Sequence, residues 1–209
     1  MIYSPQMLNT FEECPVKYFY KFIKNINMPQ LDKSFSVGKN IHALAAYYLK
    51  GDDISLFELD DNEQQMWDRL LSNKTFNLKT ELVETNVACK IDNFWIGGRL
   101  DALVTNNSNE YYILDYKTGG IPKNSKYNFQ TIIYLLCCDN MLKNKYKKLY
   151  FTYISVKSGE SEIIKLNNQL KEEYITKLRN TISGIKKLTP PMPKHNKKCE
   201  YCGYIKVCV

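Results

Sequence analysis

The sequence predicts an α/β fold, and three observations lead to this prediction. Two adjoining strand-like runs, joined by the polar turn Asn106–Asn109, lie near the middle of the 209-residue chain. Amphipathic helical patterns precede and follow this pair, and a further β-rich run, YFTYISV, comes later in the chain. Because no internal repeat or low-complexity tract interrupts the pattern, we expect a single domain over residues 1–209.

The N-terminal segment is predicted to be helical. Ser4 is a typical N-cap, and Pro5 after it suits the first helical position. Pro15 is expected to restart the helix, with Cys14 at the break between the two turns. The second helix is rich in aromatic residues, which indicates a buried face.

The next segment is predicted to supply helices that cover a sheet. Residues 27–36 read as a loop, and Gly38–Lys50 reads as a helix ended by Gly51. Residues 52–80 are polar, with apolar side chains at helical spacing that favour one or two covering helices.

The central stretch, GGRLDALVTNNSNEYYILDYKTGG, predicts a β-hairpin. A strand from Glu81 to Ile91 leads into it, one hairpin strand ends near Thr105, and the other runs from about Tyr111 to Lys117. The glycine pairs at both ends of the stretch permit close approach by another backbone.

This hairpin predicts a metal site. If its turn is centred on Ser108, Asp101 lies opposite Asp115, and two like charges at that spacing destabilise a sheet unless something neutralises them. Alternation places Lys117 on the same face as Asp115, with Tyr116 pointing away. Carboxylate oxygens suit Mg²⁺, and a neighbouring lysine can orient a water molecule, so the pattern favours metal-assisted phosphodiester hydrolysis over a solvated surface hairpin.

The C-terminal half is predicted to continue the α/β pattern. A helix is expected from about Tyr127 to Leu142, and strands over Leu149–Val156 and Glu162–Leu166. An amphipathic helix follows from Leu170 to Lys187, and the proline-rich run after it ends regular structure.

Composition narrows the class of partner. The formal net charge of +7 favours a polyanion, and the sixteen Tyr and nine Phe offer ring faces on which bases can stack, although most of these rings are expected in the core. The chain has no secretory signal pattern and no run of about 18 apolar residues, so we expect a soluble cytoplasmic protein that binds no membrane. Because it has no phosphate-loop motif, we expect no built-in ATP-driven motor.

The cysteines predict a second metal centre. Cys199, Cys202 and Cys208 have the spacing C-x2-C-x5-C, and Cys14 lies at the other end of the chain. Four thiolates can hold either structural zinc or a cubane iron-sulfur cluster, and spacing alone does not separate the two. Either would join the tail, residues 188–209, to the region around Cys14 as a metal-cluster subregion. The remaining cysteines are expected to be buried thiols: Cys89, Cys137 and Cys138.

Six motifs, taken in order, resemble the RecB-like branch of the PD-(D/E)XK nucleases. Within that branch the chain is similar to the cluster-bearing group that includes the CRISPR-associated adaptation exonucleases and the AddB nuclease domain. The motifs are FEECPVKYFY, GKNIHAL, GGRLD, LDYKTG, QTIIY and CEYCGYIKVC. The resemblance covers nearly the whole chain.

The resemblance implies a restriction-endonuclease-like fold, in which helices flank a mixed central sheet and a C-terminal region is held by cysteines. It also implies a Mg²⁺ or Mn²⁺ site whose ligands would be His42, Asp101, Asp115 and the backbone carbonyl of Tyr116. Lys117 would position and activate the attacking water. An isolated helix histidine is more often an ordinary hydrogen-bonded residue, but an imidazole preceding such a site suits Mn²⁺.

Further roles follow from the same resemblance. Gln130 and Tyr134, four residues apart on one helix face, would line the DNA path near the scissile phosphate, the alternative being an exposed helix face. Glu84 is a further candidate on the side of the site. A 4Fe-4S cluster, with zinc as the alternative, would be held by Cys14, Cys199, Cys202 and Cys208.

These features predict a Mg²⁺- or Mn²⁺-dependent deoxyribonuclease, an exonuclease acting on single-stranded DNA ends or flaps. The alternative is a catalytically silent DNA-binding or partner-binding subunit that uses the nuclease fold as a scaffold. The expected partners are DNA and, in an antiviral or repair setting, CRISPR adaptation or recombination proteins. The sequence does not fix the oligomeric state.

Overall fold

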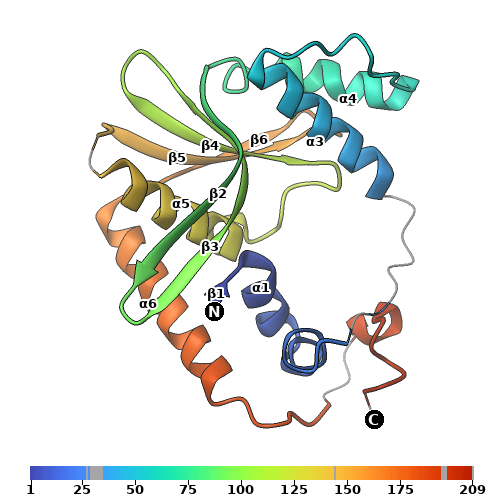
Figure 1. Ribbon diagram of the computed structural model, residues 1–209, viewed down its shortest axis with the longest axis vertical. Coiled ribbons are helices and arrows are strands. Elements are labelled where there is room, and N and C mark those ends of the chain that lie inside the picture. The colour runs from blue at the N-terminus through green and yellow to red at the C-terminus, as the bar shows by residue number, and fades with distance from the viewer. Residues whose placement is uncertain (27, 29–34, 144, 194–196, 209) are drawn as a thin grey trace.

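The computed structural model describes residues 1–26, 28, 35–143, 145–193 and 197–208. Its centre is a mixed six-stranded sheet with the strand order β1-β3-β4-β5-β6, in which β2 pairs with β3 (Figure 1). The pairs β1–β3 and β4–β5 are parallel, and the others are antiparallel. The strands are β1 (Ile2–Tyr3), β2 (Lys79–Ile91), β3 (Phe94–Thr105), β4 (Glu110–Lys117), β5 (Lys148–Ser155) and β6 (Ser161–Lys165).

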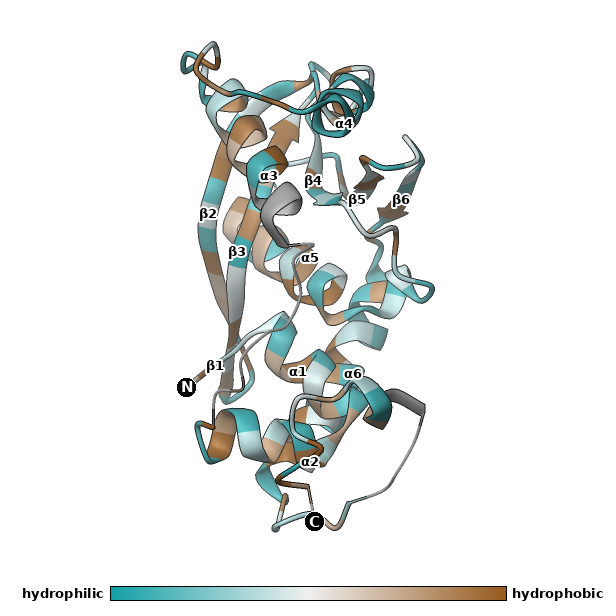
Figure 2. Ribbon diagram, turned by 90° about the vertical axis from the view of Figure 1, so that its right-hand side faces the viewer, coloured by the Kyte–Doolittle hydropathy of each residue, from teal (hydrophilic) through white to brown (hydrophobic). Residues whose placement is uncertain are grey.

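Helices cover the sheet in two groups (Figures 1 and 2). The longer ones are α1 (Pro5–Glu13), α3 (Phe35–Lys50), α4 (Asp61–Leu71), α5 (Phe129–Leu142) and α6 (Asn168–Lys186). The shorter ones are α2 (Pro15–Tyr18), the π-helix η1 (Phe19–Ile23) and the 3₁₀ helices η2 (Ser125–Tyr127) and η3 (Lys197–Tyr201). The mixed α/β fold predicted from the sequence is therefore confirmed.

Two hydrophobic cores hold these helices to the sheet. The α5 core lies against α1, α5 and α6, and its members include Leu8, Tyr18, Leu100, Leu103, Phe129, Tyr134 and Leu178. The α3 core lies against α3 and α4, and its members include Ile41, Leu44, Trp67, Phe76, Ala102 and Tyr116. Figure 2 shows brown, hydrophobic segments along β2, β3 and β5.

Strands β2 and β3 change sides at the same level of the sheet. Leu100 and Leu103 both lie in the α5 core although they are three residues apart, and Ala102 lies in the α3 core. In β2, Leu82 and Val87 both pack against the α5 core although they are five residues apart. Strict alternation puts only residues an even number apart on one face, so both strands break alternation here. This interruption, which we call the phase reversal, lies at residues 83–84 and 101–102.

Local sequence signals explain most helix starts. The Ser4 hydroxyl accepts a hydrogen bond from the Met7 amide, with Pro5 at the first helical position, as predicted. Asp60 and Glu63 form a capping box at the start of α4, the one helix that the structure places within residues 52–80.

Helix α3 begins at Phe35, three residues before the predicted start at Gly38, because a single glycine is tolerated inside a helix. The predicted loop over residues 27–36 is therefore wrong at its C-terminal end, because residues 35 and 36 are helical. Its residues 27 and 29–34 lie outside the described residues. Among the helices that the structure does describe, none is long and apolar enough to cross a membrane.

Candidate active site

The site lies where β3 and β4 separate. These strands pair from Thr105 with Tyr111 to Ala102 with Leu114, whereas β4 stays paired with β5 as far as Lys117. This register confirms the predicted turn centre, and its continuation brings Asp101 and Asp115 to the first positions beyond the paired ladder. Beyond this last pair β3 and β4 are no longer joined by backbone hydrogen bonds, and side chains fill the gap between them. We call this gap, at Asp101 and Asp115, the fork.

Glu84 extends this row of carboxylates onto β2. The pairs Val83–Ala102 and Thr85–Leu100 place Glu84 opposite Asp101. Its φ of 50° is left-handed, which is uncommon for a residue other than glycine in the middle of a strand. The phase reversal thus coincides with two neighbouring acidic residues, Glu84 and Asp101.

His42, on α3, joins the row from the side of the α3 core. Its Nε2 lies 3.0 Å from the carbonyl oxygen of Tyr116, and its Nδ1 lies 3.5 Å from Oδ2 of Asp101. The same Oδ2 accepts a hydrogen bond from the Tyr116 amide at 3.1 Å. Burial opposes the charged imidazolium, but the hydrogen bond and charge of Asp101, together with Asp115, raise the pKa of His42.

Asp115 and Lys117 form the second half of the site, on the side of α5. Nζ of Lys117 lies 2.8 Å from Oδ2 of Asp115 and donates a hydrogen bond of 2.9 Å to Oε1 of Gln130. Nε2 of Gln130 in turn donates to Oδ1 of Asp115. Burial is the largest cause that raises the pKa of Asp115 to about 7; Lys117 opposes this shift and Asp101 adds to it.

These donors fit a divalent cation. His42, Glu84 and Asp101 have ligand atoms within 4.8 Å of one another, and Tyr116 contributes its carbonyl oxygen beside His42. Within the described part of the chain, Oδ2 of Asp115 is buried and accepts no well-aligned hydrogen bond, although Nζ of Lys117 is close. Burial and the charge of Asp101 also raise the pKa of Glu84. A bound cation offsets the electrostatic repulsion between carboxylates that cluster in this way.

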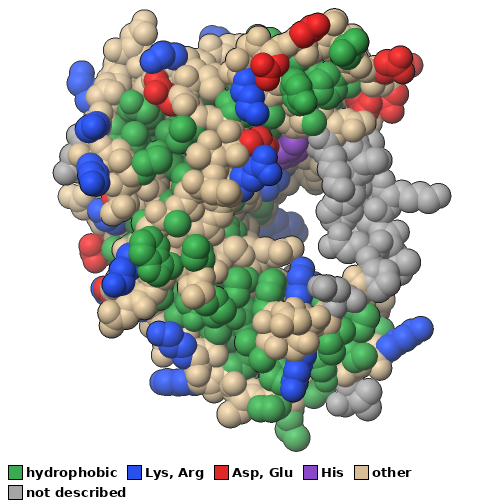
Figure 3. All heavy atoms as spheres, viewed as in Figure 1, with side chains coloured by type: hydrophobic (Ala, Val, Ile, Leu, Met, Phe, Trp, Pro, Cys, Tyr) green, Lys and Arg blue, Asp and Glu red, His purple; other side chains and the backbone are tan. Residues whose placement is uncertain are grey.

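Sequence reasoning missed Arg99, which lies next to this cluster. Its Nε lies 2.6 Å from Oε2 of Glu84 and donates to the Glu84 carbonyl oxygen at 3.1 Å. The signal was present in the motif GGRLD, where a basic residue precedes the acidic one by two positions on the same strand. Figure 3 shows a hollow in this face of the molecule, with histidine, acidic and basic atoms beside it.

Tyr134 lies deeper than a helix-face residue that contacts DNA would. Its ring is 5% exposed, and its hydroxyl donates to the carbonyl oxygen of Arg99 at 2.6 Å. That carbonyl lies on the edge of β3 between the segments paired with β1 and β4, so Tyr134 replaces a missing ladder partner. Gln130 is likewise engaged with Asp115 and Lys117. Contact of either residue with DNA stays a prediction.

Gly98 gives Tyr134 the space it needs. A Cβ atom at Gly98 would lie 2.9 Å from Cε1 of Tyr134 and 3.0 Å from its hydroxyl oxygen. A Cβ atom at Gly97 would lie 2.6 Å from the Val87 carbonyl oxygen. The close approach expected of this glycine pair is therefore present, whereas a Cβ atom at Gly119 would meet nothing within 4 Å.

The four predicted cluster cysteines converge from both ends of the chain. One small cavity is lined by Cys14, Cys199, Cys202 and Cys208. Burial and the charges of the other three raise the pKa of the Cys208 thiol. The tail is also held by Tyr204, whose hydroxyl donates to the Ile26 carbonyl oxygen at 2.7 Å and whose ring stacks on Tyr20.

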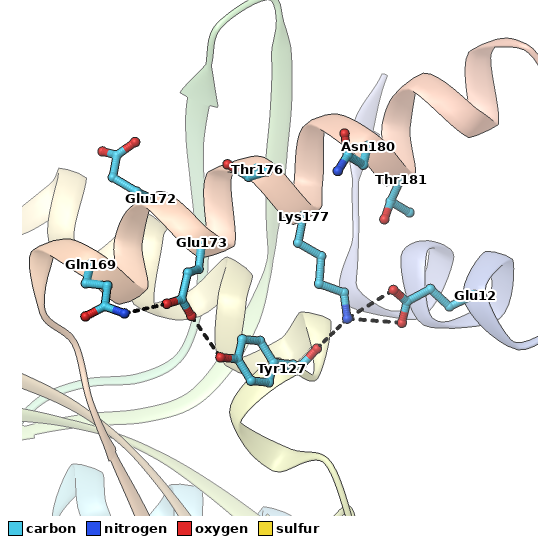
Figure 4. Close-up of a pocket in the computed structure, with 9 residues that line it drawn as sticks. All are labelled: Glu12, Tyr127, Gln169, Glu172, Glu173, Thr176, Lys177, Asn180 and Thr181. Atoms are coloured by element: carbon cyan, nitrogen blue, oxygen red, sulfur yellow. Dashed lines mark hydrogen bonds and ion pairs between the residues drawn. The ribbon is translucent and has the colours of Figure 1, made fainter.

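A larger open cavity of about 720 Å³ lies elsewhere, between α1, η2 and α6 (Figure 4). There Nζ of Lys177 lies 3.0 Å from Oε1 of Glu12, donates to the Tyr127 carbonyl oxygen at 2.8 Å and lies 4.6 Å from the centre of the Phe129 ring. These contacts join helices, and the carboxylate row of the fork is not part of this cavity.

Carboxylates, a histidine and a lysine that meet at one point of a sheet can hold a divalent cation of the kind that assists phosphodiester hydrolysis. A model of the PD-(D/E)XK nuclease superfamily matches residues 2–77 and 58–209. The chain therefore belongs to the PD-(D/E)XK nuclease superfamily, whose members use divalent metals and for which DNA is the implied substrate.

A solved structure of another protein has a similar fold. A proposed exonuclease from Eubacterium rectale superposes with a TM-score of 0.60 at 10% identity, over 96% of this chain and 87% of that one. The protein SSO0001 superposes with a TM-score of 0.46 at 17% identity, over 98% of this chain and 80% of that one. No curated protein matches this chain.

Proposed function

We propose that this chain is a Mg²⁺- or Mn²⁺-dependent deoxyribonuclease that acts as an exonuclease on single-stranded DNA ends or flaps. The observation that carries the proposal is the joint position of Asp101 and Asp115 at the fork, with His42 on one side and Lys117 on the other. The solved structure of the proposed exonuclease from Eubacterium rectale supports the proposal through its fold.

Each residue of the site would have a separate role in phosphodiester hydrolysis. His42, Asp101, Asp115 and the Tyr116 carbonyl would hold the cation. The group whose ligand atoms lie within 4.8 Å of one another is His42, Asp101 and Glu84, so Asp115 would have to approach this group when the cation binds. The bound cation would supply Lewis-acid stabilisation of the negative charge that develops on the phosphate.

Lys117 is placed to orient the attacking water and to stabilise negative charge in the transition state. Gln130 holds the Lys117 ammonium group through its carbonyl oxygen at 2.9 Å, and it holds Asp115 through its amide nitrogen. The pair is therefore oriented before substrate binds, which reduces the reorganisation needed during the reaction.

We further propose a 4Fe-4S cluster at the four cysteines. The observation that supports a metal centre here is that thiols from both ends of the chain line one small cavity. Four thiolates can hold either zinc or a cubane iron-sulfur cluster, and the choice of the cluster follows the resemblance of the cysteine motifs.

We also propose that the chain belongs to the RecB-like branch and works inside the cell with CRISPR adaptation or recombination proteins. The seven cysteines, each of which lies in the described part of the chain, form no disulfide, which is consistent with a reducing compartment.

The test is a cleavage assay on end-labelled single-stranded, duplex and flapped DNA, with Mg²⁺, Mn²⁺ or a chelator. We expect cation-dependent release of nucleotides from free ends and resistance of circular single-stranded DNA. Asp115→Asn should abolish cleavage, whereas Asp92→Asn, which changes an exposed turn residue, should not. DNA that is bound but not cleaved by the parent protein would instead favour the scaffold alternative.

A further inference from the structure

Arg99 has donors that the fold does not use. Its side chain is 62% exposed, and both of its described contacts, to the carboxylate and the carbonyl oxygen of Glu84, are made through Nε. Within the described part of the chain, neither Nη atom donates a hydrogen bond, whereas Nε donates to the Glu84 carbonyl oxygen. The Nη edge of the guanidinium therefore has no hydrogen-bond acceptor among the described residues.

Arg179 shows what a fully engaged surface arginine looks like in the same protein. Its Nε donates to Oδ2 of Asp92 at 2.6 Å and its Nη2 to Oδ1 at 3.1 Å, in a two-pronged pair. Its side chain is 52% exposed, close to the value for Arg99. The two arginines thus have similar exposure, and each pairs with a carboxylate. Arg179 uses two of its guanidinium nitrogens on that carboxylate, whereas Arg99 uses one.

The position of Arg99 suits a ligand of the active site. It precedes Asp101 by two residues on β3, a separation of about 6.7 Å along an extended strand. This is similar to the step between neighbouring phosphates of a nucleic-acid backbone. Glu84, which holds Nε, also lies in the group with His42 and Asp101, so the guanidinium is fixed relative to the site.

We propose that Arg99 binds a backbone phosphate of the substrate, next to the phosphate that is cleaved. A guanidinium presents paired N–H donors whose geometry matches phosphate oxygens. Glu84 orients the side chain from one edge, and the phosphate takes the other edge. This inference rests on the proposed function, because it assumes that a nucleic-acid strand lies across the fork.

A purely structural role for Arg99 makes a different prediction. If the guanidinium only neutralises Glu84 and supports its left-handed backbone, its loss changes stability or cation affinity and leaves contacts with DNA unchanged. A lysine at this position would then replace it well, because one positive charge suffices for neutralisation.

The first experiment measures binding without cleavage. A labelled single-stranded oligonucleotide is titrated by fluorescence anisotropy with chelator present, over a range of KCl concentrations. Arg99→Gln should weaken binding about tenfold, as expected for loss of a charge-assisted contact. It should also lower the slope of log K against log salt by about 0.7, the contribution of one phosphate on a single strand.

Two variants sharpen the result. Arg179→Gln removes the same charge from an exposed ion pair and should leave both the affinity and the salt slope at the parent values. Arg99→Lys should restore the salt slope but not the full affinity, because lysine keeps the positive charge but lacks the paired N–H donors of arginine. Thermal unfolding of each variant shows whether it is folded at the assay temperature.

The second experiment measures cleavage with Mn²⁺. Arg99→Gln should raise KM about tenfold, with a smaller change in kcat. Parent-like affinity and salt slope in Arg99→Gln, or full rescue by Arg99→Lys, would overturn the inference. If the parent protein binds DNA but never cleaves it, the proposed nuclease activity fails, while the anisotropy result still decides the role of Arg99.

Discussion

Asp115 is a carboxylate held almost entirely by its neighbours. It is 1% exposed, and burial raises its pKa to about 7 even though Lys117 lies 2.8 Å from Oδ2. Gln130 bridges the two by accepting from Lys117 and donating to Asp115. A group in this position gains from a nearby cation, because the cation favours the ionised form that burial disfavours.

Replacement of Lys117 by alanine should separate binding from chemistry. The change removes the ammonium group that would orient the water and stabilise developing charge, so cleavage should fall by about 10²–10³-fold. Affinity for single-stranded DNA measured with chelator should change little. Lys123→Ala, which removes an exposed lysine from the loop after β4, should cleave as the parent does. Parent-like cleavage by Lys117→Ala would contradict its proposed role.

At the scale of elements, strands β3 and β4 form the site by moving apart. The ladder between them ends at Ala102 with Leu114, and Tyr134 of α5 then bonds to the free edge of β3 through the Arg99 carbonyl. Gly98 allows the tyrosine ring to approach this edge. Helix α5 therefore carries both the residue that orients Lys117 and the residue that closes the gap in the sheet.

Gly98→Ala should destabilise the protein by about 1–3 kcal/mol, as expected when an added methyl group overpacks a rigid site. The methyl group would lie 2.9 Å from the Tyr134 ring and 3.2 Å from Pro5, and the Tyr134 ring is held by its hydrogen bond to the Arg99 carbonyl oxygen. Urea unfolding measures the change. Gly119→Ala, which meets nothing within 4 Å, should leave the unfolding midpoint nearly unchanged. Equal midpoints for the two variants would contradict this account.

At the scale of the whole molecule, the cysteine cavity links the two ends of the chain. Cys14 lies between α1 and α2, and the other three cysteines lie in and after η3. The hydrogen bond from Tyr204 to the Ile26 carbonyl adds a direct contact between the tail and the segment after η1. A bound cluster would therefore stabilise both ends together.

Loss of one cluster cysteine should be visible in both colour and stability. Anaerobically purified parent protein should absorb broadly near about 400 nm, and Cys202→Ser should lose this absorbance and melt at a lower temperature. Cys138→Ala, a change at a buried thiol of the α5 core, should keep the absorbance. A colourless parent protein with stoichiometric zinc would show that the metal, though not the convergence of cysteines, was predicted wrongly.

Much of this architecture could be predicted because local signals determine it. Proline and serine mark the start of α1, and the Asn/Ser turn fixes the register that places Asp101 near Asp115. The position of Glu84 could not be derived in the same way, since it depends on a left-handed residue inside a strand. The burial of Tyr134 was missed for a related reason: helical spacing shows which residues share a face, but not that a sheet edge needs a hydrogen-bond donor.

The phase reversal in β2 and β3 has a practical consequence for anyone who redesigns this scaffold. Straightening both strands into an unbroken two-residue repeat would satisfy the usual rules for stable sheets. Because cross-strand partners share a face, Glu84 and Asp101 would then point together to one face of the sheet, and the break in alternation that now presents them beside His42 would be lost. The irregularity that an engineer would first remove is thus the feature that brings the proposed cation ligands together.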